Sequence, residues 1–468
     1  MVDPHPSTSY DVVVLGGGSA GYACAFRARE LGLNVALVEK DVLGGTCLHH
    51  GCIPTKALLH AAEVADTVRD AGTFGVRCTL EDIDMTAVRA YQDRVVSRLY
   101  KGLQGLARAR ELTIVAGTAR LRGPNSVEVT GTDGTSQTLQ GSHLVLATGA
   151  RPAGLAGLKP DGRRVLTSHE ALRLERTPSS AVVVGGGFIG SEFASAWRSL
   201  GAEVTIVEAL DRLVVGEDEA CSAALRRAFT NRGITVRTES SVTAVESDND
   251  VSITLADGEQ VTTEVVLVAT GRVPVTDDLG LEEVGIRLDE RGFVQTDARL
   301  MTSVPTVTAA GDLVAGPQLA HRGFGHGIFL AEQIAGRQPT PVLDTTVPRV
   351  TYSDPQIAAV GRTEAEAVAE LGDEAVETVH YDLAGNGKSQ ILGTSGFVKV
   401  VRSKDGPVLG VHMVGARVGE LISEAQLITG WEAWPEEVAP LVHAHPTQSE
   451  ALGEAHLALA GKPLHAPG

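Results

Sequence analysis

Two segments of the chain share one pattern of apolar and polar residues. Residues 10–40 (YDVVVLGGGSAGYACAFRARELGLNVALVEK) and 180–210 (SAVVVGGGFIGSEFASAWRSLGAEVTIVEAL) both open with a run of β-branched residues that predicts a buried strand. A glycine-rich turn, a helix that ends near Gly32 or Gly201, and a second apolar strand follow in both segments. The pattern therefore predicts two strand–helix–strand units within one chain.

Each unit carries three glycines between its first strand and its helix, spaced Gly-X-Gly-X-X-Gly: Gly16, Gly18 and Gly21, then Gly185, Gly187 and Gly190. In this spacing the first glycine makes a tight turn, the second lets a pyrophosphate approach the backbone, and the third lets the helix pack on the strand. The second strand of each unit ends in an acid, Glu39 or Glu208, a residue type that accepts hydrogen bonds from ribose hydroxyls. One such fingerprint is weak evidence, but two in the same context predict two dinucleotides, one held tightly and one exchanging.

Later segments predict further elements. LVLATGARP (144–152) and VVLVATGRVP (265–274) each read as a buried strand that ends in Thr-Gly and leaves through a proline, which we interpret as crossing points between domains. TVTAAGDL (306–313) is another strand-to-turn element, from which Asp312 could reach a ligand. From residue 346 the pattern predicts strands with a hairpin turn at Asp405 and Gly406, followed by a helix. This indicates a separate α+β domain with an antiparallel sheet.

Composition narrows the class of protein. Of the 468 residues, 43% are hydrophobic and 21% charged, which is ordinary for a globular chain of two to four domains. The net charge of −18, with no cluster of lysine or arginine, argues against nucleic acid or anionic membranes as partners. The first residues do not resemble a signal peptide, and the first apolar run is too short to span a bilayer. We therefore expect a cytoplasmic protein.

Two of the five cysteines, Cys47 and Cys52, lie in GGTCLHHGCIPTK (residues 44–56). They could be metal ligands, packing residues or a redox pair. In an ideal α-helix their Cα atoms would be about 8.7 Å apart, whereas a disulfide requires less than about 7 Å. A bridge between them would therefore need a distorted segment, for which Gly51 and Pro54 are suitable.

The metal interpretation of this segment is disfavoured. His49 and His50 lie between the two cysteines, but four ligands within six residues cannot easily surround a tetrahedral zinc ion, and no second Cys/His cluster accompanies them. The remaining cysteines, Cys24, Cys78 and Cys221, are isolated and are expected to be packing or surface residues.

The segment GGTCLHHGCIPTK resembles the redox-active segment of the flavoprotein pyridine nucleotide-disulfide oxidoreductases, GGTC-x4-GC-x-P-[ST]-K. The resemblance covers essentially the whole chain, including the AGD strand and the ending HAHPTQSE (443–450). It is strongest for the branch that oxidises dihydrolipoamide with NAD⁺, and LAHRG (319–323) also resembles that branch. The resemblance implies an α/β fold with two Rossmann-like domains, one for FAD and one for NAD, and a C-terminal α+β dimerisation domain.

The domain boundaries that the resemblance implies follow the predicted elements. Residues 1–150 would bind FAD and hold the redox disulfide, and residues 151–275 would bind NAD. Residues 276–345 would form a central segment that completes the FAD site, and residues 346–468 would form the interface of a homodimer.

The resemblance also implies catalytic roles. Cys47 would exchange with the dithiol substrate, and Cys52 would lie against the flavin as the charge-transfer thiol of a Cys47–Cys52 disulfide. Lys56 and Glu192 match the pair that the family places near flavin N5.

At the C-terminal end, His445 matches the family's base and Glu450 the carboxylate that orients it, and a histidine can take a thiol proton near neutral pH. In the family this histidine reaches the disulfide of the other subunit. For His443 we expect no catalytic role.

FAD (tightly bound, one per subunit) and NAD would be bound by a set of positions that match the family, with no metal: Gly16, Gly18, Gly21, Glu39, Gly45, Thr46, Lys56, Ala119, Thr148, Gly149, Asp312, Leu319, Ala320, His321, Gly185, Gly187, Gly190, Glu208, Val242 and Gly271. A carboxylate at Glu208 would repel a 2′-phosphate, which favours NAD over NADP. The resemblance also implies that Phe188 stands where a side chain could cover the flavin.

Relatives with other substrates supply alternatives. Mercuric reductases carry extra C-terminal cysteines, and this chain has none after Cys221. An NAD(P)H-dependent reductase of the glutathione or mycothione type and a non-catalytic scaffold of the same fold remain alternatives.

The resemblance implies a homodimer whose partners are lipoyl domains and the E2 subunit, or an E2-binding segment, of a 2-oxoacid dehydrogenase complex.

Overall fold

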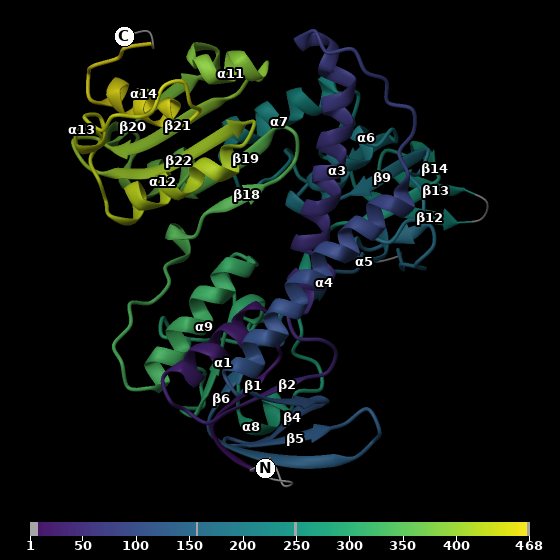
Figure 1. Cartoon of the computed structure of the whole chain (residues 1–468), viewed down its shortest axis with the longest axis vertical. Coiled ribbons are helices and arrows are strands. Elements are labelled where there is room, and N and C mark those ends of the chain that lie inside the picture. Colours follow the sequence, from purple (N-terminus) through teal and green to yellow (C-terminus); the bar gives the residue numbers. More distant parts are fainter. Residues whose placement is uncertain (1–7, 156–157, 248–249, 466–468) are drawn as a thin grey trace. The chain divides into compact units, whose positions relative to one another are not determined.

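The structure, a computed structural model, describes residues 8–155, 158–247 and 250–465. The chain divides into two compact units (Figure 1). Unit 1 contains residues 1–57, 90–153 and 272–344, and unit 2 contains residues 58–89, 154–271 and 345–468. Within the described ranges, no helix has the length and apolar character needed to cross a membrane.

Unit 1 is built on one mixed sheet. Its strands lie in the order β3-β2-β1-β6-β5-β4, and β17 also pairs with β6. The pairs β3-β2, β2-β1, β1-β6 and β6-β17 are parallel, whereas β4, β5 and the start of β6 form an antiparallel extension. The strand bounds are β1 (Ser9–Leu15), β2 (Val35–Glu39), β3 (Thr113–Ala116), β4 (Thr118–Gly123), β5 (Ser126–Thr130), β6 (Ser136–Leu146) and β17 (Val307–Ala309).

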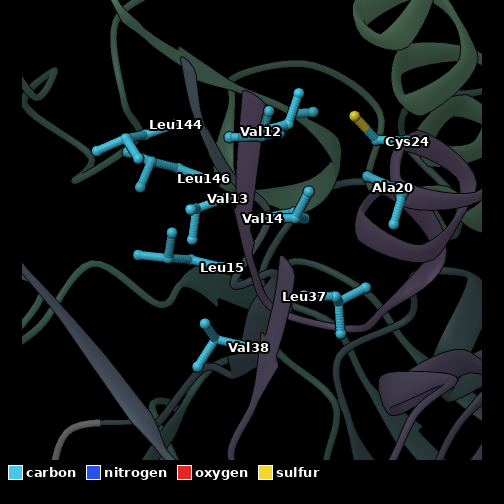
Figure 2. Packing of buried hydrophobic residues seen from close by; sticks show 14 of the residues in the cluster. Val12, Val13, Val14, Leu15, Ala20, Cys24, Leu37, Val38, Leu144 and Leu146 are labelled. Carbon is cyan, nitrogen blue, oxygen red and sulfur yellow. The ribbon is translucent and has the colours of Figure 1, made fainter. Parts of the chain in front are cut away.

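The core of unit 1 forms around the central strand β1. Val12, Val13, Val14 and Leu15 are all fully buried, and Figure 2 shows them packed among side chains of β2, β6 and the first helix. A parallel strand covered on both faces is expected to be a continuous apolar run, and this one is. The helices within unit 1 include α1 (Ser19–Glu30), α2 (Gly45–His49), α8 (Leu281–Val284) and α9 (Ala320–Ile334), whereas α3 (Cys52–Asp70) and α4 (Met85–Ala109) each have residues in both units.

Helix α9 lies directly against α1 (Figure 1). A Cβ atom on Gly327 would collide with the backbone oxygen of Ala20, and one on Gly323 would lie 3.3 Å from the Ala20 nitrogen. The two helices therefore approach each other as closely as glycine permits, which fixes the start of α9 beside the start of α1.

Unit 2 contains the second predicted strand–helix–strand unit. Its parallel sheet has the order β11-β10-β9-β15-β8. The elements are β8 (Val165–Leu166), α5 (Ser168–Ala171), β9 (Ser180–Val184), α6 (Phe188–Ser199), β10 (Glu203–Val207), α7 (Glu219–Asn231), β11 (Thr235–Arg237) and β15 (Val265–Val268), with a small antiparallel sheet of β12 (Val242–Ser247), β13 (Val251–Leu255) and β14 (Gln260–Thr263).

The C-terminal part of unit 2 is a five-stranded antiparallel sheet in the order β18-β19-β22-β21-β20. Its elements are β18 (Arg349–Thr351), β19 (Gln356–Gly361), α10 (Glu364–Leu371), β20 (Val376–Asp382), α11 (Gly387–Leu392), β21 (Phe397–Ser403), β22 (Val408–Gly415), α12 (Val418–Gly430), α13 (Pro435–Val438) and α14 (Glu450–Leu459). Asp405, at φ +52°, and Gly406 form the turn between β21 and β22. The predicted fold class is therefore confirmed.

A buried ion pair joins the two parts of unit 2. Both carboxylate oxygens of Asp218 accept hydrogen bonds from Lys399 Nζ, at 2.8 and 2.9 Å. Asp218 also caps α7 through the Ala220 N–H and accepts the Glu364 N–H. Because the lysine leaves neither oxygen unpaired, both charges can be buried.

The two Thr-Gly segments lead into neighbouring strands. Their exits, β7 (Ala150–Pro152) and β16 (Arg272–Pro274), pair with each other as an antiparallel two-stranded sheet. Thr148 Oγ1 donates to the Val275 carbonyl at 2.7 Å, and the Val275 N–H donates to the Gly149 carbonyl at 2.9 Å.

Candidate active and cofactor sites

The first glycine turn connects β1 to α1 in unit 1. Gly16 has φ +103°, a conformation that side chains rarely adopt. A Cβ atom on Gly21 would collide with the Gly16 carbonyl, so this glycine allows α1 to pack on the end of β1. A Cβ atom on Gly18 would meet no atom within 4 Å. The middle glycine thus borders open space at the start of a helix, which suits a pyrophosphate.

The turn in unit 2 repeats this arrangement. Gly185 has φ +107°, a Cβ atom on Gly190 would collide with the Gly185 carbonyl, and one on Gly187 would meet nothing within 4 Å. The three glycines therefore have similar backbone angles and similar surrounding space in both units. Phe188, the first residue of α6, is 43% exposed.

The two acids are held at these turns by backbone amides. Glu39 accepts the Gly17 N–H at 2.6 Å and the Asp41 N–H at 2.8 Å. Glu208 accepts the Gly186 N–H at 2.6 Å and the Leu210 N–H at 2.8 Å. Each carboxylate oxygen keeps a lone pair, so both acids can still accept hydrogen bonds from a ribose hydroxyl.

The cysteine segment is tied to the first glycine turn. The Gly44 N–H donates to the Gly17 carbonyl at 2.8 Å. A Cβ atom on Gly45 would lie only 2.8 Å from the Gly18 Cα, and Gly45 has φ +58°. These contacts explain why glycines precede the cysteines.

The helical path breaks between the two cysteines, as their spacing requires. Helix α2 ends at His49 and α3 begins at Cys52. Both cysteines are thiols here, in hydrogen-bond contact. The hydrogen bond to Cys52 and burial raise the pKa of Cys47, and Lys56 partly opposes them. The two thiols therefore lie close enough for the exchange chemistry of a redox pair.

Charged groups of unit 1 surround this pair. Burial raises the pKa of Asp312, while Arg272 and Arg322 act to lower it. Burial lowers the pKa of Arg272, while Asp312 and Cys52 act to raise it. Arg272 also donates to the Ala150 carbonyl. The sequence predicted Asp312 but missed Arg272, although its place after the second Thr-Gly could have drawn attention to it.

A groove on the surface of unit 1 also escaped prediction. It has a volume of about 530 Å³ and lies between α1 and α9. The Tyr22 ring lies 5.6 Å from both the Phe26 and Phe324 rings, measured between centroids, and Ile328 adds an exposed apolar surface. Burial raises the pKa of Tyr22 to about 12, with a smaller contribution from Cys47 nearby.

His445 and Glu450 form a hydrogen-bonded pair in unit 2. His445 Nδ1 lies 2.8 Å from Glu450 Oε1, and the Thr447 N–H donates to Oε2 at 2.7 Å. Burial raises the pKa of Glu450, but the bonds from Thr447 and His445 outweigh it and leave this pKa lowered. The His445 side chain is 76% exposed. His443 instead bonds Glu424 at 2.7 Å and packs on Gly453.

The remaining predicted cofactor-binding residues lie on several different elements. Thr148 lies against Gly16, and Leu319, Ala320 and His321 form the start of α9 beside α1. Ala119 is buried on β4, Val242 opens β12, and Gly271 has φ +119°. Thr46 accepts the His50 N–H within the cysteine segment.

Some predicted partners fall in different units. Lys56 and the cysteines belong to unit 1, whereas Glu192 and His445 belong to unit 2. Glu192, only 2% exposed, accepts the Tyr352 N–H at 3.0 Å. The pairing of Lys56 with Glu192 and the approach of His445 to the cysteines stay predictions.

The histidines between the cysteines contact other groups of unit 1. His49 Nε2 lies 3.0 Å from the Leu43 carbonyl oxygen, and His50 lies 3.9 Å from Asp41. In the part of the chain that the structure describes, there is no group of three or more Cys, His, Asp or Glu residues arranged for a metal ion.

Comparisons with known proteins agree with this geometry. Residues 10–327 match the family described as pyridine nucleotide-disulphide oxidoreductase, and residues 347–456 match its dimerisation domain. The chain is 41% identical to dihydrolipoyl dehydrogenase of Bacillus subtilis, over 98% of this chain and 100% of that protein. It is 36% identical to the mitochondrial dihydrolipoyl dehydrogenase of Pisum sativum, over 98% and 93%.

Among solved structures, LpdA of Mycobacterium tuberculosis superposes with a TM-score of 0.90 and 26% identity, over 97% of this chain and 100% of that chain. On these matches, the chain belongs to the pyridine nucleotide-disulphide oxidoreductase family.

Proposed function

We propose that this chain is a dihydrolipoyl dehydrogenase that uses FAD and NAD⁺. The observation that carries the proposal is the contact between the Cys47 and Cys52 thiols beside a dinucleotide-type glycine turn. Full-length identity to dihydrolipoyl dehydrogenases supports the same activity. Bound FAD would take the electron pair from the two thiols and deliver it as hydride to NAD⁺.

The residues of this chain divide the thiol chemistry between them. A thiolate of the substrate attacks Cys47 of the disulfide form, and Cys52 leaves as a thiolate. The second substrate thiol then displaces Cys47, which releases the cyclic disulfide and leaves both protein cysteines reduced. His445 takes the substrate's proton, and Glu450 holds its ring and stabilises the imidazolium.

The groove between α1 and α9 suits an apolar arm. Its aromatic lining includes Tyr22, whose pKa Cys47 also raises. At its edge, Arg27 and Glu332 are paired, with Nε 3.0 Å from Oε1, so they present little net charge. A dithiol on a hydrocarbon chain fits this lining better than a charged peptide disulfide does, which favours a lipoyl substrate over the glutathione-type alternative.

The residues present fit the two cofactors. The FAD site would use the glycine turn at Gly16–Gly21, with Glu39 at the ribose, and Asp312 would suit hydroxyl groups of the ribityl chain. The NAD site would use the equivalent turn in unit 2. Glu208 is held there as a hydrogen-bond acceptor, which suits a free ribose 2′-hydroxyl and disfavours a 2′-phosphate.

We further propose that the protein acts as a homodimer in the cytoplasm, with the four-domain division predicted from the sequence. A match to the family's dimerisation domain supports the dimer. The partner's His445 would then serve each disulfide. Lipoyl domains and the E2 subunit, or an E2-binding segment, would be its macromolecular partners.

One set of measurements tests the proposal. The purified protein should be yellow, and an anaerobic dithiol should produce a long-wavelength thiolate-to-flavin band. The value of kcat/KM for dihydrolipoamide with NAD⁺ should exceed that for glutathione disulfide or mycothione disulfide with NADPH. A protein that binds FAD but turns over none of these substrates would instead support a scaffold.

A further inference from the structure

A buried arginine contacts the turn that carries Asp312. This turn, residues 311–315, follows β17 and lies beside α9. Arg322 of α9 is only 4% exposed. Its Nη2 donates to the Ala315 carbonyl at 2.6 Å, and its Nη1 lies 3.5 Å from the carbonyl oxygens of Gly311 and Val314. A single guanidinium therefore contacts both ends of the turn.

Asp344 fixes the direction of this guanidinium. Arg322 Nε lies 2.6 Å from Asp344 Oδ1, and Nη2 lies 3.1 Å from Oδ2. Such a two-point pair sets the plane of the guanidinium and compensates its burial. Gly316, at φ +123°, leaves room for the pair, because a Cβ atom there would collide with both side chains.

His326, one helical turn after Arg322, contacts the same residue, Gly311, through the peptide group on its other side. The Gly311 N–H donates to His326 Nδ1 at 3.3 Å, and the ring is 2% exposed. Burial lowers the pKa of His326 to about 4; Arg322 lowers it further, and Asp344 opposes the change. The ring is therefore neutral at neutral pH, and Nδ1 stays available as an acceptor. Gly311 itself has φ +70°.

The clamped turn leaves Asp312 a fixed direction. Its carboxylate is close enough to Arg272 and Cys47 to affect their ionisation. We propose that Arg322 and His326 are positioning residues, which hold the 311–315 turn so that Asp312 meets the bound FAD. The inference rests on the proposed use of FAD and assigns no chemical step to either residue.

Variants of the full-length protein test the clamp through FAD affinity, measured from the fluorescence of released FAD. Arg322→Met should raise the dissociation constant of FAD by about tenfold, the effect of losing one charge-assisted hydrogen bond. His326→Leu should raise it severalfold. His326→Gln should stay near wild type, because an amide oxygen can accept the Gly311 N–H.

Gln333 supplies a matched control on the same helix. Its Nε2 donates to the Arg299 carbonyl at 3.2 Å, away from the 311–315 turn. Gln333→Met should lower the thermal midpoint and leave the FAD dissociation constant unchanged. A drop in FAD affinity as large as that of Arg322→Met would show that any loosening of α9 suffices, and would overturn the proposal.

A double variant separates positioning from general damage. If Arg322 acts through Asp312, then Arg322→Met combined with Asp312→Asn should bind FAD no more weakly than the weaker single variant. Fully additive losses would overturn the proposal. If Arg322→Met does not fold, equal FAD affinities for His326→Leu and His326→Gln would overturn it instead. A wild-type protein that binds no FAD would contradict the proposed function itself.

Discussion

Nδ1 of His445 lies 2.8 Å from Oε1 of Glu450, and the other oxygen of that carboxylate accepts the Thr447 N–H at 2.7 Å. The backbone thus orients the carboxylate, and the carboxylate orients the ring. With Nδ1 so occupied, Nε2 is the nitrogen left to exchange a proton with a substrate. An oriented His–carboxylate pair of this kind can act as a base toward a thiol.

Replacing this base should affect only one half-reaction. We expect His445→Gln to slow flavin reduction by dihydrolipoamide by about 100-fold or more, the usual contribution of a general base. Reduction of the flavin by NADH should change little. Stopped-flow measurement of both half-reactions checks this. His443→Gln is the matched control: His443 forms a similar pair with Glu424 but is only 13% exposed, and it should leave the dithiol rate intact.

The roles of the two cysteines should be distinguishable from the absorbance spectra of their serine variants. The resemblance to the family assigns the charge-transfer role to Cys52, so we expect Cys52 to supply the thiolate that interacts with the flavin. Cys52→Ser should therefore lack the long-wavelength band after anaerobic reduction, whereas Cys47→Ser should show it without a reductant. Absorbance spectra of the two variants test this prediction. The reverse pattern would show that the roles of Cys47 and Cys52 are exchanged.

Glu39 and Glu208, the equivalent acids of the two strand–helix–strand units, should each affect the binding of a different cofactor. Glu208→Ala should raise the KM for NAD⁺ by about tenfold, the value of one or two lost hydrogen bonds, and leave dithiol reduction of the flavin intact. Glu208→Arg should increase the relative use of NADP⁺. Glu39→Ala is the reciprocal control, expected to weaken FAD retention and spare the KM for NAD⁺. If Glu208→Ala also slowed the reduction of the flavin by dithiol, our placement of the NAD site would be wrong.

Substitutions of two glycines of the second turn should have different effects. One should weaken NAD⁺ binding, and the other should lower the stability of the protein. Gly187→Ala adds a methyl group to open space, so the protein should fold normally but lose affinity for NAD⁺. Gly190→Ala should lower the thermal midpoint of the FAD-loaded protein, because its methyl group would collide with the Gly185 carbonyl. Calorimetry and NAD⁺ titration together check both. Normal NAD⁺ binding by Gly187→Ala would show that no phosphate lies at this position.

Buried histidines should make the fold sensitive to acid. Burial lowers the pKa of both His326 and His412 to about 4, whereas in the unfolded chain they titrate near 6.5. The unfolded state therefore binds more protons as pH falls from about 6.5 to about 4, and stability falls through that window by up to roughly 3 kcal/mol per histidine.

His412→Gln tests this directly. Glutamine can still donate to the Arg362 carbonyl, as His412 Nε2 can at 2.8 Å, but does not titrate. The variant should lose less stability than wild type between pH 7 and pH 4.5, measured by denaturant unfolding with saturating FAD. The exposed His60 gives the control His60→Gln, which should follow wild type. Equal losses in all three proteins would assign the acid sensitivity to other groups.

The amino-acid sequence by itself determined the local elements. The strand–glycine–helix units and the Asp405-Gly406 turn were predicted correctly, because each depends on residues close together in the chain. The role of the acids Glu39 and Glu208 at a ribose stays a prediction. The break between Cys47 and Cys52 was predictable for the same reason, since an unbroken helix would hold them too far apart. The resemblance to the family supplied the catalytic roles.

Only the tertiary structure decided which distant residues meet. Arg272 comes beside Cys52 and Asp312 because the paired strands β7 and β16 return the chain to unit 1. The groove at Tyr22 and the burial of Arg322 depend on α9 packing against α1 through Gly323 and Gly327. Residues about 300 positions apart acquire such contacts only when the whole core forms, because burial and close packing are properties of the assembled layers rather than of any local pattern.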